Sequence, residues 1–178
     1  MTSNTTRLLA LGAAILGAAA LRLVPHLPNF SPIAAMALFS GAYVGRRGLA
    51  FVAPLAALLL SDAILGFYRG MGFVYGSMAL VVLIGWWIST RRTPLRIGVG
   101  AVAGSALFYV LTNFGMWLFS GYYPRTLAGL EACYVAAIPF FQNTLAGDLF
   151  FTVLLFGSFA ILEKLVPAIR EPARPQLA

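Results

Sequence analysis

The chain has few of the residues from which most catalytic and metal sites are built. Its 178 residues include one cysteine, one histidine and five acidic side chains. The single Cys133 excludes an intrachain disulfide or a CxxC motif, and the single His26 excludes a histidine metal cluster. No GxSxG, HExxH or phosphate-loop motif occurs. We therefore expect no enzymatic activity, no bound metal and no cofactor.

Charge is also scarce, at 10% of residues against about a quarter in soluble domains, whereas 61% of residues are hydrophobic. Six helices of about 20 residues would use nearly the whole chain. We therefore predict an all-α membrane protein with six transmembrane helices in one integral domain, residues 1–178. The predicted spans are residues 8–24, 31–45, 48–66, 71–89, 97–119 and 144–165.

The basic residues are distributed unevenly between the two ends of these spans. Only Arg22, Arg69 and Arg125 lie at one end. Basic residues in short loops stay in the cytoplasm, so both termini are predicted to be cytoplasmic. The same bias accounts for most of the net charge of +7, which therefore does not indicate nucleic-acid binding. The basic residues at the other end are Arg7, Arg46, Arg47, Arg91, Arg92, Arg96, Lys164, Arg170 and Arg174.

Two segments do not read as membrane spans. The longer of the two is residues 120–143. The apolar half of this segment is too short to cross the membrane and contains Pro139. We expect an interfacial or partly re-entrant cap over the outer face. The tail, residues 166–178, contains three prolines and is expected to be loosely ordered.

Four polar residues lie in or at the edge of the spans, where an ionisable group costs several kcal/mol unless it is paired or faces a cavity. Asp62 and Asn113 are expected about 21 and 24 Å above the cytoplasmic helix ends, and Asp148 about 7–8 Å below Asn143. They converge on the outer third of the bilayer, beneath loops rich in aromatic residues. A pocket that is lined by aromatic residues and contains a few placed polar groups is what a small organic ligand requires. The predicted ligand contacts are Asn29, Tyr75, Asn113, Asn143 and Asp148; His26, Asp62, Trp117 and Tyr134 either bind ligand or are structural.

Each candidate also has a structural interpretation. Asp62 and Asp148 could pair with Arg69, Arg22 or helix-terminal donors, and the asparagines could form interhelical hydrogen bonds. The aromatic residues could form an interfacial belt.

A small-residue stripe, Ala10, Ala14 and Ala18, lies on one face of the first helix. It either packs against the protein's own helices or docks a partner.

This pattern resembles the substrate-binding S components of energy-coupling-factor (ECF) vitamin transporters, which are six-span proteins with cytoplasmic termini. The alanine stripe looks like the AxxxA face with which they dock on a coupling subunit. The resemblance implies a ligand site under the outer loops, no catalysis within the chain, and a partner ATPase pair. Three strings, PNFSPIAAMALFSGAY (28–43), LTNFGMW (111–117) and AIPFFQNTLAGDLFF (137–151), are also similar to a bacterial membrane-protein family of unassigned function.

The leading hypothesis is a substrate-binding subunit of a vitamin or micronutrient uptake system in the bacterial inner membrane. Its ligand would be captured from the outer face. The alternative is a non-transporting membrane protein that assembles with or stabilises a larger membrane complex. In that case the alanine stripe is the functional surface and the buried polar residues hold the helices together.

Overall fold

The fold is all-α over the part of the chain that the computed structural model describes, residues 3–21, 27–44 and 47–170. Three of its helices, α4, α5 and α6, are long and apolar enough to cross a membrane. The prediction of an all-α chain with membrane-type helices is therefore confirmed at this coarser level. The elements are α1 (Ser3–Leu21), α2 (Ile33–Tyr43), α3 (Arg47–Leu65), α4 (Met71–Ser89), α5 (Pro94–Phe119), α6 (Leu127–Leu165) and the 3-10 helix η1 (Pro167–Ile169).

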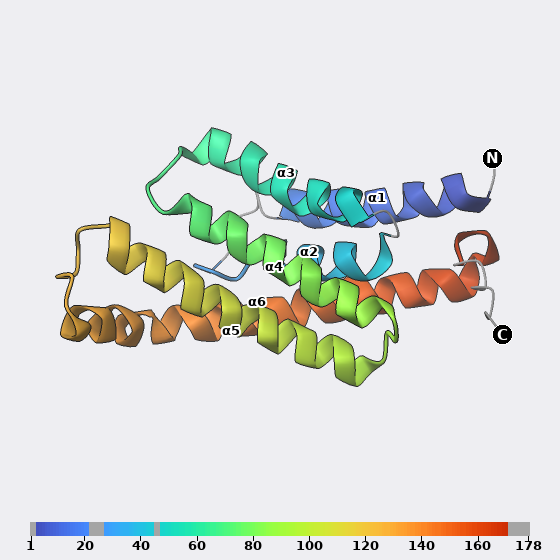
Figure 1. Cartoon of the computed structure of the whole chain (residues 1–178). Coiled ribbons are helices and arrows are strands. Elements are labelled where there is room, and N and C mark those ends of the chain that lie inside the picture. The colour runs from blue at the N-terminus through green and yellow to red at the C-terminus, as the bar shows by residue number, and fades with distance from the viewer. Residues whose placement is uncertain (1–2, 22–26, 45–46, 171–178) are drawn as a thin grey trace.

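Helix α2 is the shortest described α-helix and lies at the centre of the bundle (Figure 1). All 11 of its residues are buried, and it packs against each of the other five α-helices. Its four alanines and Gly41 let neighbouring backbones approach closely. The helix is shorter than the predicted span 31–45, because the chain is non-helical before Pro32 and extended at Val44.

Most other boundaries agree with the predicted spans within a few residues. Helix α4 covers the predicted 71–89. Helix α5 begins at Pro94 instead of 97, because the Thr93 side chain accepts a hydrogen bond from the Arg96 N–H and caps the helix. Helix α1 begins at Ser3 instead of residue 8, and residues 22–24 of its predicted span lie outside the described residues.

The last helix begins much earlier than predicted and includes most of the segment 120–143, which the sequence predicted to be a cap. Residues 127–143 belong to α6, which runs unbroken for 39 residues and includes Pro139. Thr126 caps its N-terminus by accepting a hydrogen bond from the Gly129 N–H. Packing along α5 supports this part of α6, since the Tyr134 hydroxyl donates to the Val110 carbonyl at 2.6 Å. At about 58 Å, α6 is nearly twice the thickness of the hydrocarbon core, so it extends beyond that core.

The first residues of the predicted loose tail are ordered. Helix η1 follows α6 directly, and Ile169 is buried. Arg7 in α1 forms a salt bridge with Glu163 at 2.9 Å and donates to the Ile169 carbonyl at 2.6 Å. These contacts join the start of α1 to the end of α6. Residues 171–178 of the predicted tail lie outside the described residues.

The connections between helices define two ends of the bundle (Figure 1). The start of α1, the end of α6 and the α4–α5 connection lie together at one end, which we call the basic end. The α3–α4 and α5–α6 connections lie at the opposite end, with Arg69 and Arg125. The basic end has the described residues Arg7, Arg91, Arg92, Arg96, Lys164 and Arg170.

Candidate binding cavity

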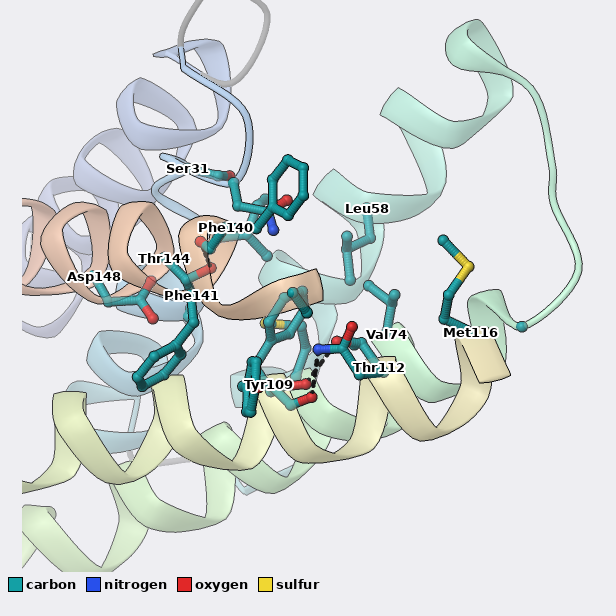
Figure 2. A pocket seen from close by; sticks show the side chains of 18 of the residues that line it. Ser31, Leu58, Val74, Tyr109, Thr112, Met116, Phe140, Phe141, Thr144 and Asp148 are labelled. Carbon is teal, nitrogen blue, oxygen red and sulfur yellow. Dashed lines mark hydrogen bonds between the residues drawn. The ribbon is translucent and has the colours of Figure 1, made fainter. Parts of the chain in front are cut away.

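A cavity of about 580 Å³ lies among α2–α6, beside the N-terminal end of α2 (Figure 2). Small-molecule sites in proteins have volumes of about 300–1,000 Å³, so the cavity is large enough for an organic ligand. Its lining is mainly apolar and aromatic, with a few polar side chains. The lining residues are Asn29, Ser31, Ile33, Ala34, Leu58, Tyr68, Arg69, Gly70, Val74, Met78, Phe108, Tyr109, Thr112, Asn113, Met116, Ala137, Phe140, Phe141, Thr144 and Asp148.

Burial of the lining residues distinguishes a floor from a mouth. Asp148, Ala34 and Met78 are buried and form part of the floor. Asn29 and Arg69 are exposed and belong to the connections that precede α2 and α4. The cavity therefore opens toward the end of the bundle opposite the basic end.

The segment that leads into α2 fixes the position of the cavity floor. A turn closed by a hydrogen bond from the Phe30 N–H to the Leu27 carbonyl contains Asn29, whose φ of 63° is left-handed. Asparagine tolerates that conformation better than most residues. Gly147 of α6 packs against Phe30 and Ser31 so closely that a Cβ there would lie 3.1 Å from the Phe30 Cα. This close approach brings α6, and with it Asp148, to the start of α2.

Asp148 is the most deeply placed charged residue of the lining. It is 4% exposed, and its carboxylate points from α6 toward the cavity (Figure 2). The Ser105 hydroxyl of α5 lies 2.6 Å from Oδ2. Among the described residues, Ser105 is its one hydrogen-bond partner and no basic side chain forms a salt bridge with it. An ionised carboxylate accepts up to about four hydrogen bonds, which leaves capacity for a ligand.

Asn113 and Thr112 supply polar atoms from α5. The Asn113 Nδ2 donates to the Tyr109 carbonyl at 2.8 Å, and the Thr112 hydroxyl donates to the Phe108 carbonyl at 2.7 Å. Each group thus donates one hydrogen bond within its own helix, and the second N–H of the Asn113 amide has no acceptor among the described residues. The Asn113 Oδ1 accepts no hydrogen bond from the described residues, so this oxygen is available to a ligand.

Three of the five predicted ligand contacts, Asn29, Asn113 and Asp148, line the cavity. Tyr75 and Asn143 are not among its lining residues. The Tyr75 hydroxyl donates instead to Asp62 Oδ2 at 2.9 Å, which links α4 to α3.

The remaining candidates have structural partners or fall outside the described residues. Asn143 Nδ2 donates to the Pro28 carbonyl at 3.1 Å, and Trp117 Nε1 donates to the Pro124 carbonyl at 3.0 Å. Tyr134 braces α6 against α5 through its bond to Val110. His26 lies outside the described residues.

The alanine stripe of α1 faces inward where it is described. Ala10 and Ala14 are partly buried and pack against the core next to the buried Leu11 and Ile15. This placement favours packing within the chain over docking of a partner. The side chain of Ala18 lies outside the described residues.

Several lining residues had no signal of their own in the sequence. Thr144 and Phe141 lie on the face of α6 that contains Asp148, at spacings of four and seven residues. Tyr109 lies four residues before Asn113 on α5. Projection of helical faces from Asp148 and Asn113 would have found them.

The chain belongs to a family of unknown function, DUF6580, whose model matches residues 2–169. Every residue that lines the cavity lies within the matched region. No curated protein and no solved structure matches the chain. The resemblance to S components therefore stays a hypothesis, and function must be argued from the cavity.

Proposed function

We propose that this protein is a membrane subunit that binds a small organic molecule captured from the outer face. The observation that carries the proposal is the cavity of about 580 Å³, which combines an apolar and aromatic lining with a buried carboxylate at its floor. Burying a carboxylate among apolar helices costs several kcal/mol, so its place in a cavity favours a functional role.

The proposed topology has six crossings with both termini in the cytoplasm. The three helices that are long and apolar enough would supply three crossings, and α1 and α3 would supply two more. Helix α2 rises only about 16 Å, roughly half of the hydrocarbon core. We infer that the segment 27–32 completes the sixth crossing and lines the cavity there. Irregular backbone at membrane depth is tolerated where it borders a cavity.

Because the sequence contains no phosphate-loop motif with which to use ATP, the energy for uptake would come from a partner or from an ion gradient. As in the S components that the chain resembles, a coupling subunit and an ATPase pair would supply the energy. The ligand would be a vitamin or related micronutrient. The alternative, a non-transporting assembly protein, has less support, since Ala10 and Ala14 already pack inside the chain.

The test uses two neighbouring alanines of α6, of which one lines the cavity and the other does not. Ala137 is 8% exposed and lines the cavity, whereas Ala136 is exposed. Ala137→Phe places a ring in the cavity, and Ala136→Phe adds the same ring outside it. Native mass spectrometry of protein purified gently from host membranes should detect an organic molecule in wild type and Ala136→Phe, and none in Ala137→Phe.

Two results would contradict the proposal. One is wild-type protein that carries no organic molecule and binds none from a micronutrient mixture. The other is a bound molecule that Ala137→Phe retains at wild-type occupancy. If the bare protein instead co-purifies with a large membrane complex that lacks an ATPase, the assembly function is supported.

A further inference from the structure

The two charged residues of the cavity occupy different environments, which bears on the charge of a ligand. Of the described lining residues, only Asp148 and Arg69 belong to the charged types Asp, Glu, Lys and Arg. Arg69 is exposed at the mouth, where water and salt screen its charge. Asp148 is 4% exposed at the floor, where a charge acts at much lower dielectric. The charge of Asp148 at the floor therefore affects the charge preference for a ligand more than the charge of Arg69 at the mouth.

The start of α2 is the other source of charge near the floor. Its residues Ile33 and Ala34 line the cavity, and Ala34 and Ala35 lie with Asp148 along a narrow crevice. A helix N-terminus is equivalent to about half a positive charge. It offsets part of the carboxylate charge but leaves the floor negative when Asp148 is ionised. Ser105 donates a neutral hydrogen bond and does not change that balance.

Aromatic rings also line the cavity. Tyr109 and Phe141 lie 4.8 Å apart between ring centroids, and Phe108 and Phe140 also belong to the lining. The faces of aromatic rings attract organic cations, an interaction that strengthens on removal from water. The Tyr109 hydroxyl donates to the Tyr134 carbonyl at 2.6 Å, which holds this ring in place.

We propose that the ligand is a small organic monocation with an apolar or aromatic body. Its charged nitrogen binds the Asp148 carboxylate, and its body packs against the aromatic rings. This inference rests on the proposed ligand-binding function and adds the charge class of the ligand. With Asp148 ionised, a neutral ligand would leave the carboxylate without a counter-charge, and an anion would be repelled from the floor.

The experiment compares three probes that share one ring system and differ in charge: naphthalen-2-ylmethylammonium, naphthalen-2-ylmethanol and 2-naphthoate. Calorimetric titration of the full chain in detergent measures their affinities. Wild type should bind the cation at least about tenfold more tightly than the alcohol, because hydrogen bonds to charged groups are the stronger ones. Asp148→Asn should remove this preference.

Asp62→Asn is the matched control. Asp62 is 3% exposed and accepts a hydrogen bond from Tyr75, as Asp148 does from Ser105, but it does not belong to the cavity lining. The preference for the cation should survive this substitution. Its loss in Asp62→Asn as well would show that the effect is not local to the cavity, and would overturn the proposal.

Other outcomes separate this proposal from the proposed function. Equal binding of the cation and the alcohol by wild type, or a preference that persists in Asp148→Asn, overturns the charge class. A neutral or anionic molecule that co-purifies with wild type and is absent from Ala137→Phe also overturns the charge class. The ligand-binding function then stands. If no probe binds and no molecule co-purifies, both proposals fail.

Discussion

At the scale of single residues, buried hydroxyl groups matter through the acceptors that they satisfy. Ser77 donates to the Val74 carbonyl of its own helix. That carbonyl also accepts the backbone hydrogen bond of the helix. Ser105 donates to the carboxylate of another helix, at 2.6 Å. Both serines are fully buried. Removal of the second bond leaves a buried charged group without a described partner, so equal burial does not imply an equal contribution to stability.

Ser105→Ala should lower the free energy of unfolding by about 1–3 kcal/mol, the range for a buried polar group that loses its partner. Ser77→Ala should cost less, because the Val74 carbonyl keeps its helical hydrogen bond. Unfolding in mixed detergent micelles, followed by circular dichroism, measures both. A Ser105→Ala variant no less stable than Ser77→Ala would show that Asp148 does not depend on this donor.

At the scale of elements, the contact between α2 and α4 depends on two glycines that face each other. A Cβ at Gly41 would overlap the Val82 carbonyl and lie 2.9 Å from the Gly85 Cα. A Cβ at Gly85 would lie 2.8 Å from the Gly41 Cα. The obstructing atoms are backbone, which cannot rotate away as a side chain can. Small residues at such crossings let helices pack in lipid, where the hydrophobic effect does not hold them together.

Gly41→Ala or Gly85→Ala should therefore destabilise the bundle by about 1–3 kcal/mol or more, as overpacking does in cores. Gly76→Ala is the control on α4, because a Cβ there meets nothing within 4 Å. Alanine favours helix over glycine by up to about 1 kcal/mol, so the control should be neutral or stabilising. Comparison of melting temperatures in detergent checks this. A loss in Gly76→Ala as large as in Gly41→Ala would contradict a steric cause.

At the scale of the whole molecule, an all-α fold with membrane-type helices could be predicted from the sequence, because apolar runs are local signals. The sequence did not predict that α6 continues through residues 127–143. A proline removes one backbone donor but does not end a helix that its neighbours support, and that support comes from α5. Likewise, Asn113 and Asp148 line the cavity as predicted, because their depth follows from helix rise. Tyr75 and Asn143 do not, because depth says nothing about the direction of a side chain.

The contact between the start of α1 and the end of α6 could not be predicted from sequence patterns either. Arg7 and Glu163 are separated by 156 residues but form a salt bridge whose side chains are 7% and 23% exposed. Removal of one partner leaves a buried charge, whereas replacement of both by apolar residues does not. Glu163→Leu should therefore destabilise more than the double variant Arg7→Met/Glu163→Leu. Chemical unfolding of the four members of this cycle tests the coupling, and additive effects would contradict it.

The orientation of the bundle gives the last prediction, which depends on where the basic residues lie. The basic end should face the cytoplasm, since basic residues in short loops are retained there. In a Cys133→Ser background, Tyr122→Cys and Phe67→Cys place exposed thiols at the opposite end, and Leu95→Cys places one near the basic end. A membrane-impermeant maleimide should label positions 122 and 67 in intact cells, and position 95 only after permeabilisation. The reverse pattern would place the cavity mouth in the cytoplasm and would contradict capture from outside. Labelling of 95 and 122 from the same side would instead contradict a crossing by α5.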